Sequence, residues 1–182
     1  MIRYLTLILA LVLLSPAARA AGDQYASLKP LLGTWIVDKT CGTYKDRVLV
    51  VIKRLPKTVV ANFHDLKMTQ NLGRADIFSA GEDGRYNIVA ALPDNEVLKA
   101  MGLKSIAGTL VVSDDDSDPE GPGKDYLTMS SRVSVLSNLL TIKLRENYKK
   151  ATFILKTESP LGGQTCKGSG SKLPAPKKGS GN

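Results

Sequence analysis

The sequence contains few of the side chains that carry out chemistry. Its 182 residues include one histidine and two cysteines, which are too few to complete a structural zinc site. The two cysteines do not form a Cys-x-x-Cys redox pair. Gly-x-Ser-x-Gly, His-Glu-x-x-His, P-loop and dinucleotide-binding patterns are also missing. We therefore expect a protein that is not an enzyme and that holds no cofactor or metal.

Aromatic residues are scarce, and the basic residues do not form the pattern that nucleic-acid binding requires. Phe, Trp and Tyr make up 5% of the chain. The formal net charge is +8, but two arginines lie in the first twenty residues and four lysines in the last sixteen. Removing these six from the 25 basic residues leaves 19 against 17 acidic ones, a net charge of +2. Such a nearly neutral region without interleaved aromatics is not expected to bind nucleic acid.

The longest apolar run stands at the N-terminus. Residues 5–14 (LTLILALVLL) follow Arg3 and precede Ala18-Arg19-Ala20, which is the pattern of a secretory signal peptide. A membrane anchor is the alternative, but a spanning helix needs about 20 apolar residues, and Ser15-Pro16 ends this run early. We predict a signal peptide at residues 1–20, cleavage after Ala20, and a periplasmic or secreted protein.

The rest of the chain suits one domain, which we place at residues 21–166. We expect residues 167–182 to form a disordered basic tail. This segment (KGSGSKLPAPKKGSGN) has a single leucine among Gly, Ser, Pro and Lys, so it lacks the apolar side chains that would offset the entropy of ordering it. Its four lysines suggest contact with anionic envelope surfaces, with a solubilising extension as the alternative.

Between the two cysteines the sequence has the pattern of β-strands. Apolar and polar residues alternate in short runs that turn residues separate, so each run has one apolar face. Short connections, among them a tight turn at Ser137-Asn138, let only neighbouring strands pair. This predicts an all-β fold, an antiparallel up-and-down meander barrel of about eight to nine strands. The nine candidate strands are residues 34–41, 47–55, 58–66, 74–80, 85–92, 105–113, 125–136, 139–147 and 150–158.

Cys41 and Cys166 are 125 positions apart. An even pair of cysteines in a chain predicted to be exported favours a disulfide. Closing so long a loop stabilises a fold by about 4–5 kcal/mol in the chain-entropy model. The bond would hold the end of the first strand beside the segment after the last predicted one. The two ends of the sheet would then be neighbours, which favours a closed barrel.

Two segments interrupt the strand pattern. PDNEVLKAMGLK, residues 93–104, has an acidic start after Pro93 and ends near Gly102, with apolar residues at helical spacing between them. It predicts a short helix at 94–101, which could cover one mouth of the barrel. The acidic loop at residues 114–125 has Pro119 where an EF-hand needs glycine. We expect it to be solvated and to bind no metal.

Near the start of the domain, a short helix-like lead (GDQYASLKPLL, residues 22–32) precedes Gly33-Thr34-Trp35 at the start of the first strand. This order, followed by a meander of strands, resembles the lipocalin family of small secreted calycin-type β-barrels. The resemblance implies that the Gly-x-Trp turn closes the narrow end of the barrel, and that Arg132 or Arg145 packs on Trp35. A lone Trp beside a turn is usually a core residue with its indole N–H on a backbone carbonyl.

The resemblance also implies an exported, non-catalytic binding protein for a small apolar ligand or lipid. Apolar side chains converge inward, and the sequence shows no exposed aromatic hot spot. Two alternatives stay open: a protein-binding barrel, such as an inhibitor of an extracytoplasmic hydrolase, and an envelope structural protein. The predicted ligand-binding residues are Trp35, Val50, Phe63, Tyr86, Ile88, Met101, Met129 and Leu144.

Overall fold

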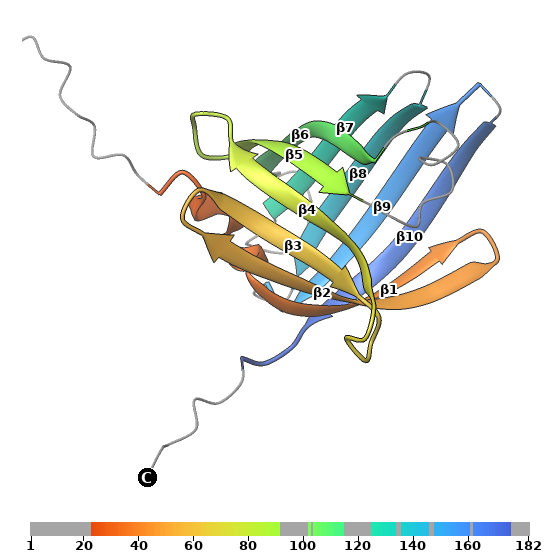
Figure 1. Ribbon diagram of the computed structural model, residues 1–182, viewed down its shortest axis with the longest axis horizontal. Helices are drawn as coiled ribbons and strands as arrows, with labels where there is room; N and C mark the ends of the chain where they lie inside the picture. The colour runs from red at the N-terminus through yellow and green to blue at the C-terminus, as the bar shows by residue number, and fades with distance from the viewer. Residues whose placement is uncertain are drawn as a thin grey trace, which may run out of the picture.

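The computed structural model describes residues 23–91, 102, 104–114, 125–133, 136–145, 148–160 and 162–175. These residues form one short 3₁₀ helix and ten antiparallel strands in a closed barrel (Figure 1). Each strand pairs with its neighbours in the chain, and β1 pairs with β10 to close the sheet. The elements are η1 (Ala26–Leu31), β1 (Gly33–Cys41), β2 (Tyr44–Leu55), β3 (Thr58–His64), β4 (Asn71–Ser79), β5 (Arg85–Ala91), β6 (Ser105–Asp114), β7 (Asp125–Val133), β8 (Leu136–Arg145), β9 (Lys150–Ser159) and β10 (Gly162–Lys172).

The predicted all-β, up-and-down antiparallel barrel is confirmed, but it has ten strands instead of eight to nine. The nine candidate runs correspond to β1–β9. The tenth strand includes residues 167–172, which we expected to begin a disordered tail. That expectation is wrong because β9 and β1 satisfy the backbone of β10 from both sides. A strand paired on both edges does not depend on an apolar pattern of its own.

Glycine lets β10 fit between its neighbours. Gly168 lies opposite Phe153 in the pairing of β9 with β10. A Cβ atom at position 168 would overlap the Phe153 ring and the carbonyl oxygen of Asp38. The aromatic ring therefore covers the backbone of β10, and packing by the neighbouring strand replaces the side chain that glycine lacks.

The predicted disulfide between Cys41 and Cys166 is present. The two residues lie opposite each other in the pairing of β1 with β10, and their Cα atoms are 4.2 Å apart. The bond therefore fastens the first strand to the last, where the sheet closes. Because it encloses 125 positions of sequence, it removes much of the freedom of the unfolded chain.

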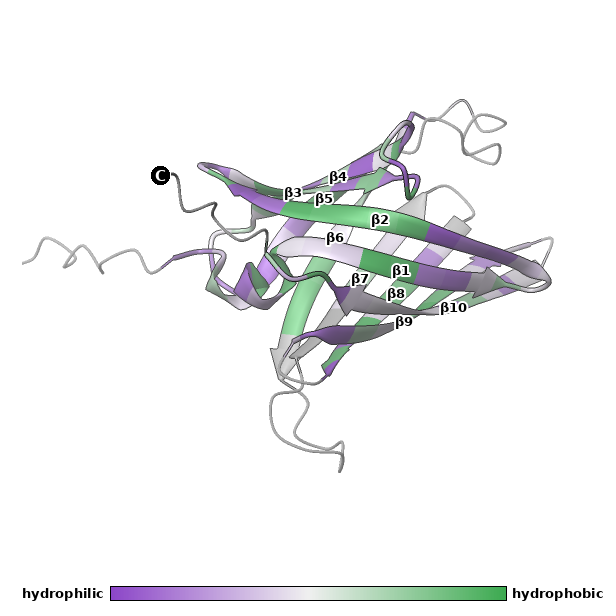
Figure 2. Cartoon of the chain, turned by 90° about the horizontal axis from the view of Figure 1, so that it is seen from below, coloured by the Kyte–Doolittle hydropathy of each residue, from purple (hydrophilic) through white to green (hydrophobic). Residues whose placement is uncertain are grey.

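The buried core gathers at the end of the barrel that η1 covers. In Figure 1 the start of the described chain lies at this end, beside the turn from β2 to β3. In Figure 2 the middle of β2 is hydrophobic and its two ends are hydrophilic. Apolar side chains of η1 fill the end of the lumen, so we call this the closed end. The buried core consists of Tyr25, Leu28, Leu31, Trp35, Val48, Val50, Val59, Ala61, Ala75, Ile77, Tyr86, Ile88, Leu110 and Leu144.

Several predictions fall on residues outside those that the structure describes. They are the signal peptide at 1–20, the helix at 94–101 with Met101, most of the acidic loop (115–124) and the end of the basic tail (176–182). Among the described residues, the only helix is the six-residue η1, and it is far too short to span a bilayer.

We predict that Gly168→Ala destabilises the barrel, because the added methyl group must displace the Phe153 ring or the backbone of β1. Overpacking of this kind lowers the free energy of unfolding by about 1–3 kcal/mol, which urea denaturation will measure. Gly163→Ala is the matched control on the same strand, since its Cβ would meet Thr157 at an ordinary 3.4 Å. Equal losses for the two variants would contradict the role assigned to Gly168.

Candidate functional site

Trp35 closes one end of the lumen. Its side chain is 3% exposed, and its Nε1 donates a hydrogen bond to the Leu31 carbonyl oxygen at 2.8 Å. This confirms the expected core position with the indole N–H on a backbone carbonyl. The Lys172 ammonium lies 5.5 Å from the centroid of the Trp35 ring and donates to the Pro30 carbonyl oxygen at 2.8 Å. The last strand thus supplies Lys172 as a basic partner to Trp35, a residue that the resemblance to lipocalins did not name.

Gly33 is required by this arrangement. Its φ of +127° lies in a region that side chains rarely allow, and a Cβ atom there would be 2.9 Å from Cε of Lys172. The alkyl chain of Lys172 therefore passes over Gly33 on its way to Trp35. Burial lowers the pKa of Lys172 below its ordinary value.

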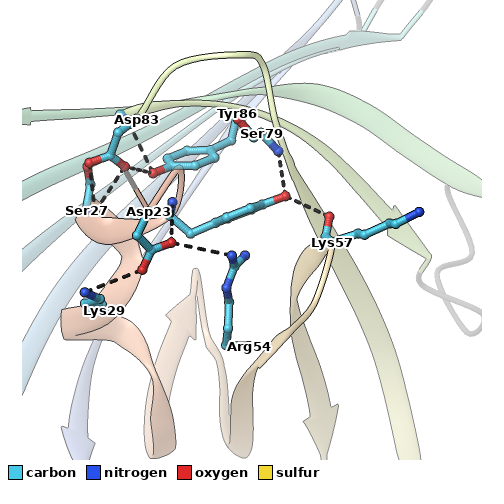
Figure 3. A network of polar contacts seen from close by, with 10 residues as sticks. Asp23, Ser27, Lys29, Arg54, Lys57, Ser79, Asp83 and Tyr86 are labelled. Atoms are coloured by element: carbon cyan, nitrogen blue, oxygen red, sulfur yellow. Dashed lines mark hydrogen bonds and ion pairs between the residues drawn. The ribbon is translucent and has the colours of Figure 1, made fainter. Parts of the chain in front are cut away.

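A polar network holds the segment that precedes β1 against the closed end (Figure 3). The Tyr25 hydroxyl donates to the Lys57 carbonyl oxygen at 2.7 Å and accepts from the Ser79 amide at 3.0 Å. The Tyr25 ring stacks on the Tyr86 ring with centroids 5.7 Å apart. The guanidinium of Arg54, on β2, lies 3.6 Å from the centroid of the Tyr25 ring. The β2–β3 and β4–β5 connections are thereby tied to the segment that precedes β1.

Asp83 completes this network from the turn between β4 and β5. Its carboxylate accepts hydrogen bonds from the Tyr86 hydroxyl at 2.5 Å and from the Ser27 amide at 3.1 Å. Desolvation works to raise the pKa of Asp83, but the hydrogen bonds from Tyr86, Ser27 and Gly84 outweigh it and lower the pKa. Burial and the bond to Asp83 raise the pKa of Tyr86. These groups hold η1 and the turn between β4 and β5 together at the closed end.

The other half of the lumen keeps exposed apolar surface. Met129, Leu140 and Leu155 are cross-strand neighbours on β7, β8 and β9. Leu140 alternates in phase with the core residue Leu144 on β8, and Met129 pairs with the core residue Leu110 on β6, so the three neighbours face inward. Each of them is only half-buried. Phe153 on β9 and Phe63 on β3 are half-buried on the same inner face. We call these five residues the open half of the lumen.

A row of polar side chains crosses the inner wall near the mouth. Thr157 Oγ1 donates to Asn138 Oδ1 at 2.9 Å, and Asn138 Nδ2 donates to Ser131 Oγ at 3.4 Å. Ser131 is 8% exposed. Gly108 on β6 makes room for it, because a Cβ there would be 2.9 Å from the Ser131 Cβ. We call Ser131, Asn138 and Thr157 the polar row.

The sequence analysis missed the polar row because it placed a tight turn at Ser137-Asn138. The structure corrects this, since β8 already begins at Leu136. Ser and Asn are common in turns, which favoured the wrong boundary. The available signal was the phase of alternation, because Asn138 stands two residues before the inward-facing Leu140.

The predicted ligand-binding residues divide into two groups. Seven of the eight lie among the described residues, and all seven face the lumen. Phe63 and Met129 belong to the open half, whereas Met101 lies outside the described residues. The others are packed in the buried core at the closed end: Trp35, Val50, Tyr86, Ile88 and Leu144.

Two surface cavities lie away from the predicted residues. One of about 370 Å³ follows the outer wall of β7–β9, because five of its seven lining residues alternate with inward-facing ones. Its lining is Ser130, Ser131, Ser137, Asn138, Leu139, Lys156 and Glu158. The other, of about 560 Å³, lies outside the closed end around Tyr25, Arg54 and Phe78. Most residues around both cavities are polar or charged in type.

Comparison with known proteins adds no assignment. No protein-family model matches the chain, and no curated protein is significantly similar to it in sequence. The site is therefore defined by its geometry, an apolar open half of the lumen with a polar row near its mouth.

We predict that Asp83→Asn weakens the closed end in a pH-dependent manner. The lowered pKa of Asp83 means that its contribution is present above the ordinary pKa of an aspartate and is lost as the pH falls through the folded-state value. The free energy of unfolding should drop by about 0.5–1.5 kcal/mol at pH 7, and the difference from wild type should vanish near pH 2.

Glu82→Gln is the control for this experiment. Glu82 makes an exposed ion pair with Arg85 at 3.2 Å, which contributes little to stability. The midpoint of urea unfolding, measured from pH 7 to pH 2, reports both variants. A difference between wild type and Asp83→Asn that stays constant across this range would contradict the prediction.

Proposed function

We propose that this protein is an exported, non-catalytic, lipocalin-like barrel that binds a small apolar ligand in the open half of its lumen. The observation that carries the proposal is the exposed inner surface of Phe63, Met129, Leu140, Phe153 and Leu155. Water in contact with such surface is released when an apolar ligand covers it, which favours binding by about 25 cal/mol per Å². Because the closed end is packed, such a ligand would enter at the mouth and stop above the core.

The strand number supports room for a ligand. A barrel of about eight strands holds packed side chains or one small ligand, and the diameter grows with the number of strands. This barrel has ten. Because η1 and the core pack one end of this lumen, we propose that a ligand fills the other half.

The likeness to lipocalins is supported at the closed end. A short helix, η1, precedes the Gly33-Thr34-Trp35 turn, and Trp35 packs beneath it with a basic side chain over the ring. The barrel departs from the family in its strand number, since lipocalin barrels have eight strands. We therefore propose the family's mode of binding, inside the barrel, and not a specific family ligand.

Export is supported by two independent features. The pattern of residues 1–20 is that of a signal peptide, and the Cys41–Cys166 disulfide is of a kind that persists in oxidising compartments. A periplasmic or secreted protein that meets lipids or other apolar molecules outside the cytoplasm is consistent with both.

We predict that Leu155→Trp blocks the lumen. The larger side chain would occupy the space beside Leu140 on the inner wall and should weaken binding of the apolar fluorophore N-phenyl-1-naphthylamine at least about tenfold. Ile154→Trp is the matched control, because Ile154 is the next residue on β9 and is 41% exposed on the outer wall. It should leave the Kd within about twofold of wild type.

Fluorescence titration and thermal unfolding of both variants complete the test. Wild-type protein that does not bind the fluorophore, or equal loss of affinity in both variants, would refute binding inside the lumen. Co-purification of an empty barrel with another protein from its host would favour the protein-binding alternative instead.

A further inference from the structure

The polar row interrupts an otherwise apolar wall. Along β8 the inward-facing residues after Asn138 are Leu140, Ile142 and Leu144, and along β9 those before Thr157 are Leu155 and Phe153. Polar groups in an apolar lumen are costly unless they are hydrogen-bonded. The row meets this requirement partly by bonding to itself, through the contacts from Thr157 to Asn138 and from Asn138 to Ser131.

The row has hydrogen-bonding capacity to spare. An Asn amide carries two donor hydrogens and an oxygen with two acceptor sites, and a Ser hydroxyl can donate as well as accept. The contact from Asn138 Nδ2 to Ser131 Oγ is 3.4 Å, which is long for a hydrogen bond. A ligand oxygen that approaches from the lumen can therefore compete for the amide hydrogen. Gln164 on β10 extends the row, since it pairs with Thr157.

The row is uncharged. Among the described residues on the same inner face towards the mouth, Lys39 and Asp46 are charged, but they pair with each other at 3.3 Å. Lys172 lies at the opposite, closed end, on Trp35 and the Pro30 carbonyl. Lys156 borders the outer cavity beside Ser131 and Asn138, but it alternates with the inward-facing Leu155 and Thr157 and so points outward. A ligand carboxylate at the row would therefore lose its hydration without gaining an unpaired cation on the inner face. A neutral polar group would exchange water for the amide and hydroxyl groups at little cost.

Resting on the proposed function, we propose that the bound molecule is an amphiphile with a neutral hydrogen-bonding head, a hydroxyl, ester or amide. The head bonds to Asn138 and Ser131, and the apolar chain runs along Leu140, Phe153 and Leu155 towards the closed end. The four residue steps of β8 from Asn138 to Ile142 span about 13 Å. This length fits a medium acyl or alkyl chain with its head held just inside the mouth.

Decan-1-ol, sodium decanoate and N-phenyl-1-naphthylamine separate the head from the chain. Calorimetric titration at pH 7.5 should give wild-type protein a Kd for decan-1-ol at least about tenfold lower than for decanoate. Asn138→Leu should weaken decan-1-ol binding about tenfold and leave the naphthylamine, which relies on apolar contact, within about twofold. In a lumen that recognises only apolar surface, Asn138→Leu would instead bind decan-1-ol more tightly than wild type. An increase in the Kd for decan-1-ol therefore supports recognition of the head group by Asn138, and a decrease contradicts it.

Two further variants keep the test interpretable. Thr157→Val keeps the shape and the fold while it removes the hydroxyl that orients Asn138, so it should also weaken decan-1-ol selectively. Asn87→Leu is the control, because Asn87 is exposed on the outer wall of β5, and it should change neither affinity.

The outcomes distinguish the two proposals. If wild-type protein binds none of the three probes, the proposed function fails and the head-group assignment fails with it. If the naphthylamine binds but Asn138→Leu and Thr157→Val bind decan-1-ol as well as wild type does, only the assignment of the polar row is overturned. Tighter binding of decanoate than of decan-1-ol would overturn the neutral head.

Discussion

The pairing of β1 with β10 is the constraint on which the rest of the structure depends. It turns a ten-stranded meander into a sheet without free edges, so the alternation of side chains becomes a division between lumen and outside. Every inward-facing residue of the open half and of the polar row owes its position to that closure. Without this pairing the sheet would be open, with one apolar face and an unpaired edge on each of β1 and β10.

The sequence predicted those strands whose own side chains supply the apolar face. It could not predict β10, because the stabilising contacts of that strand belong to its neighbours. Phe153 covers Gly168 from β9, and Trp35 and Lys172 meet across the pairing with β1. A segment of Gly, Ser and Lys looks unstructured when it is considered alone. Its order comes from residues that are distant in the chain, and no local pattern records them.

The candidate site was predictable to the same degree. Alternation correctly placed Phe63, Met129, Val50 and Leu144 on one inner face. It could not show which half of that face is packed, because this depends on where η1 fits into the lumen. The contact between Ser27 and Asp83 joins residues 56 positions apart, and such a contact leaves no periodic signal. The polar row escaped notice because turn-forming residue types outweighed the phase of the strand.

The disulfide lies on the mouth side of the seam between β1 and β10, at the end of β1. Backbone hydrogen bonds alone would make this seam the natural place for the barrel to unzip, since its two strands are the most distant in sequence. The covalent bond makes residues 41–166 a ring that fraying of either terminus cannot open. Any lateral opening between the first and last strands would therefore require this bond to be broken first.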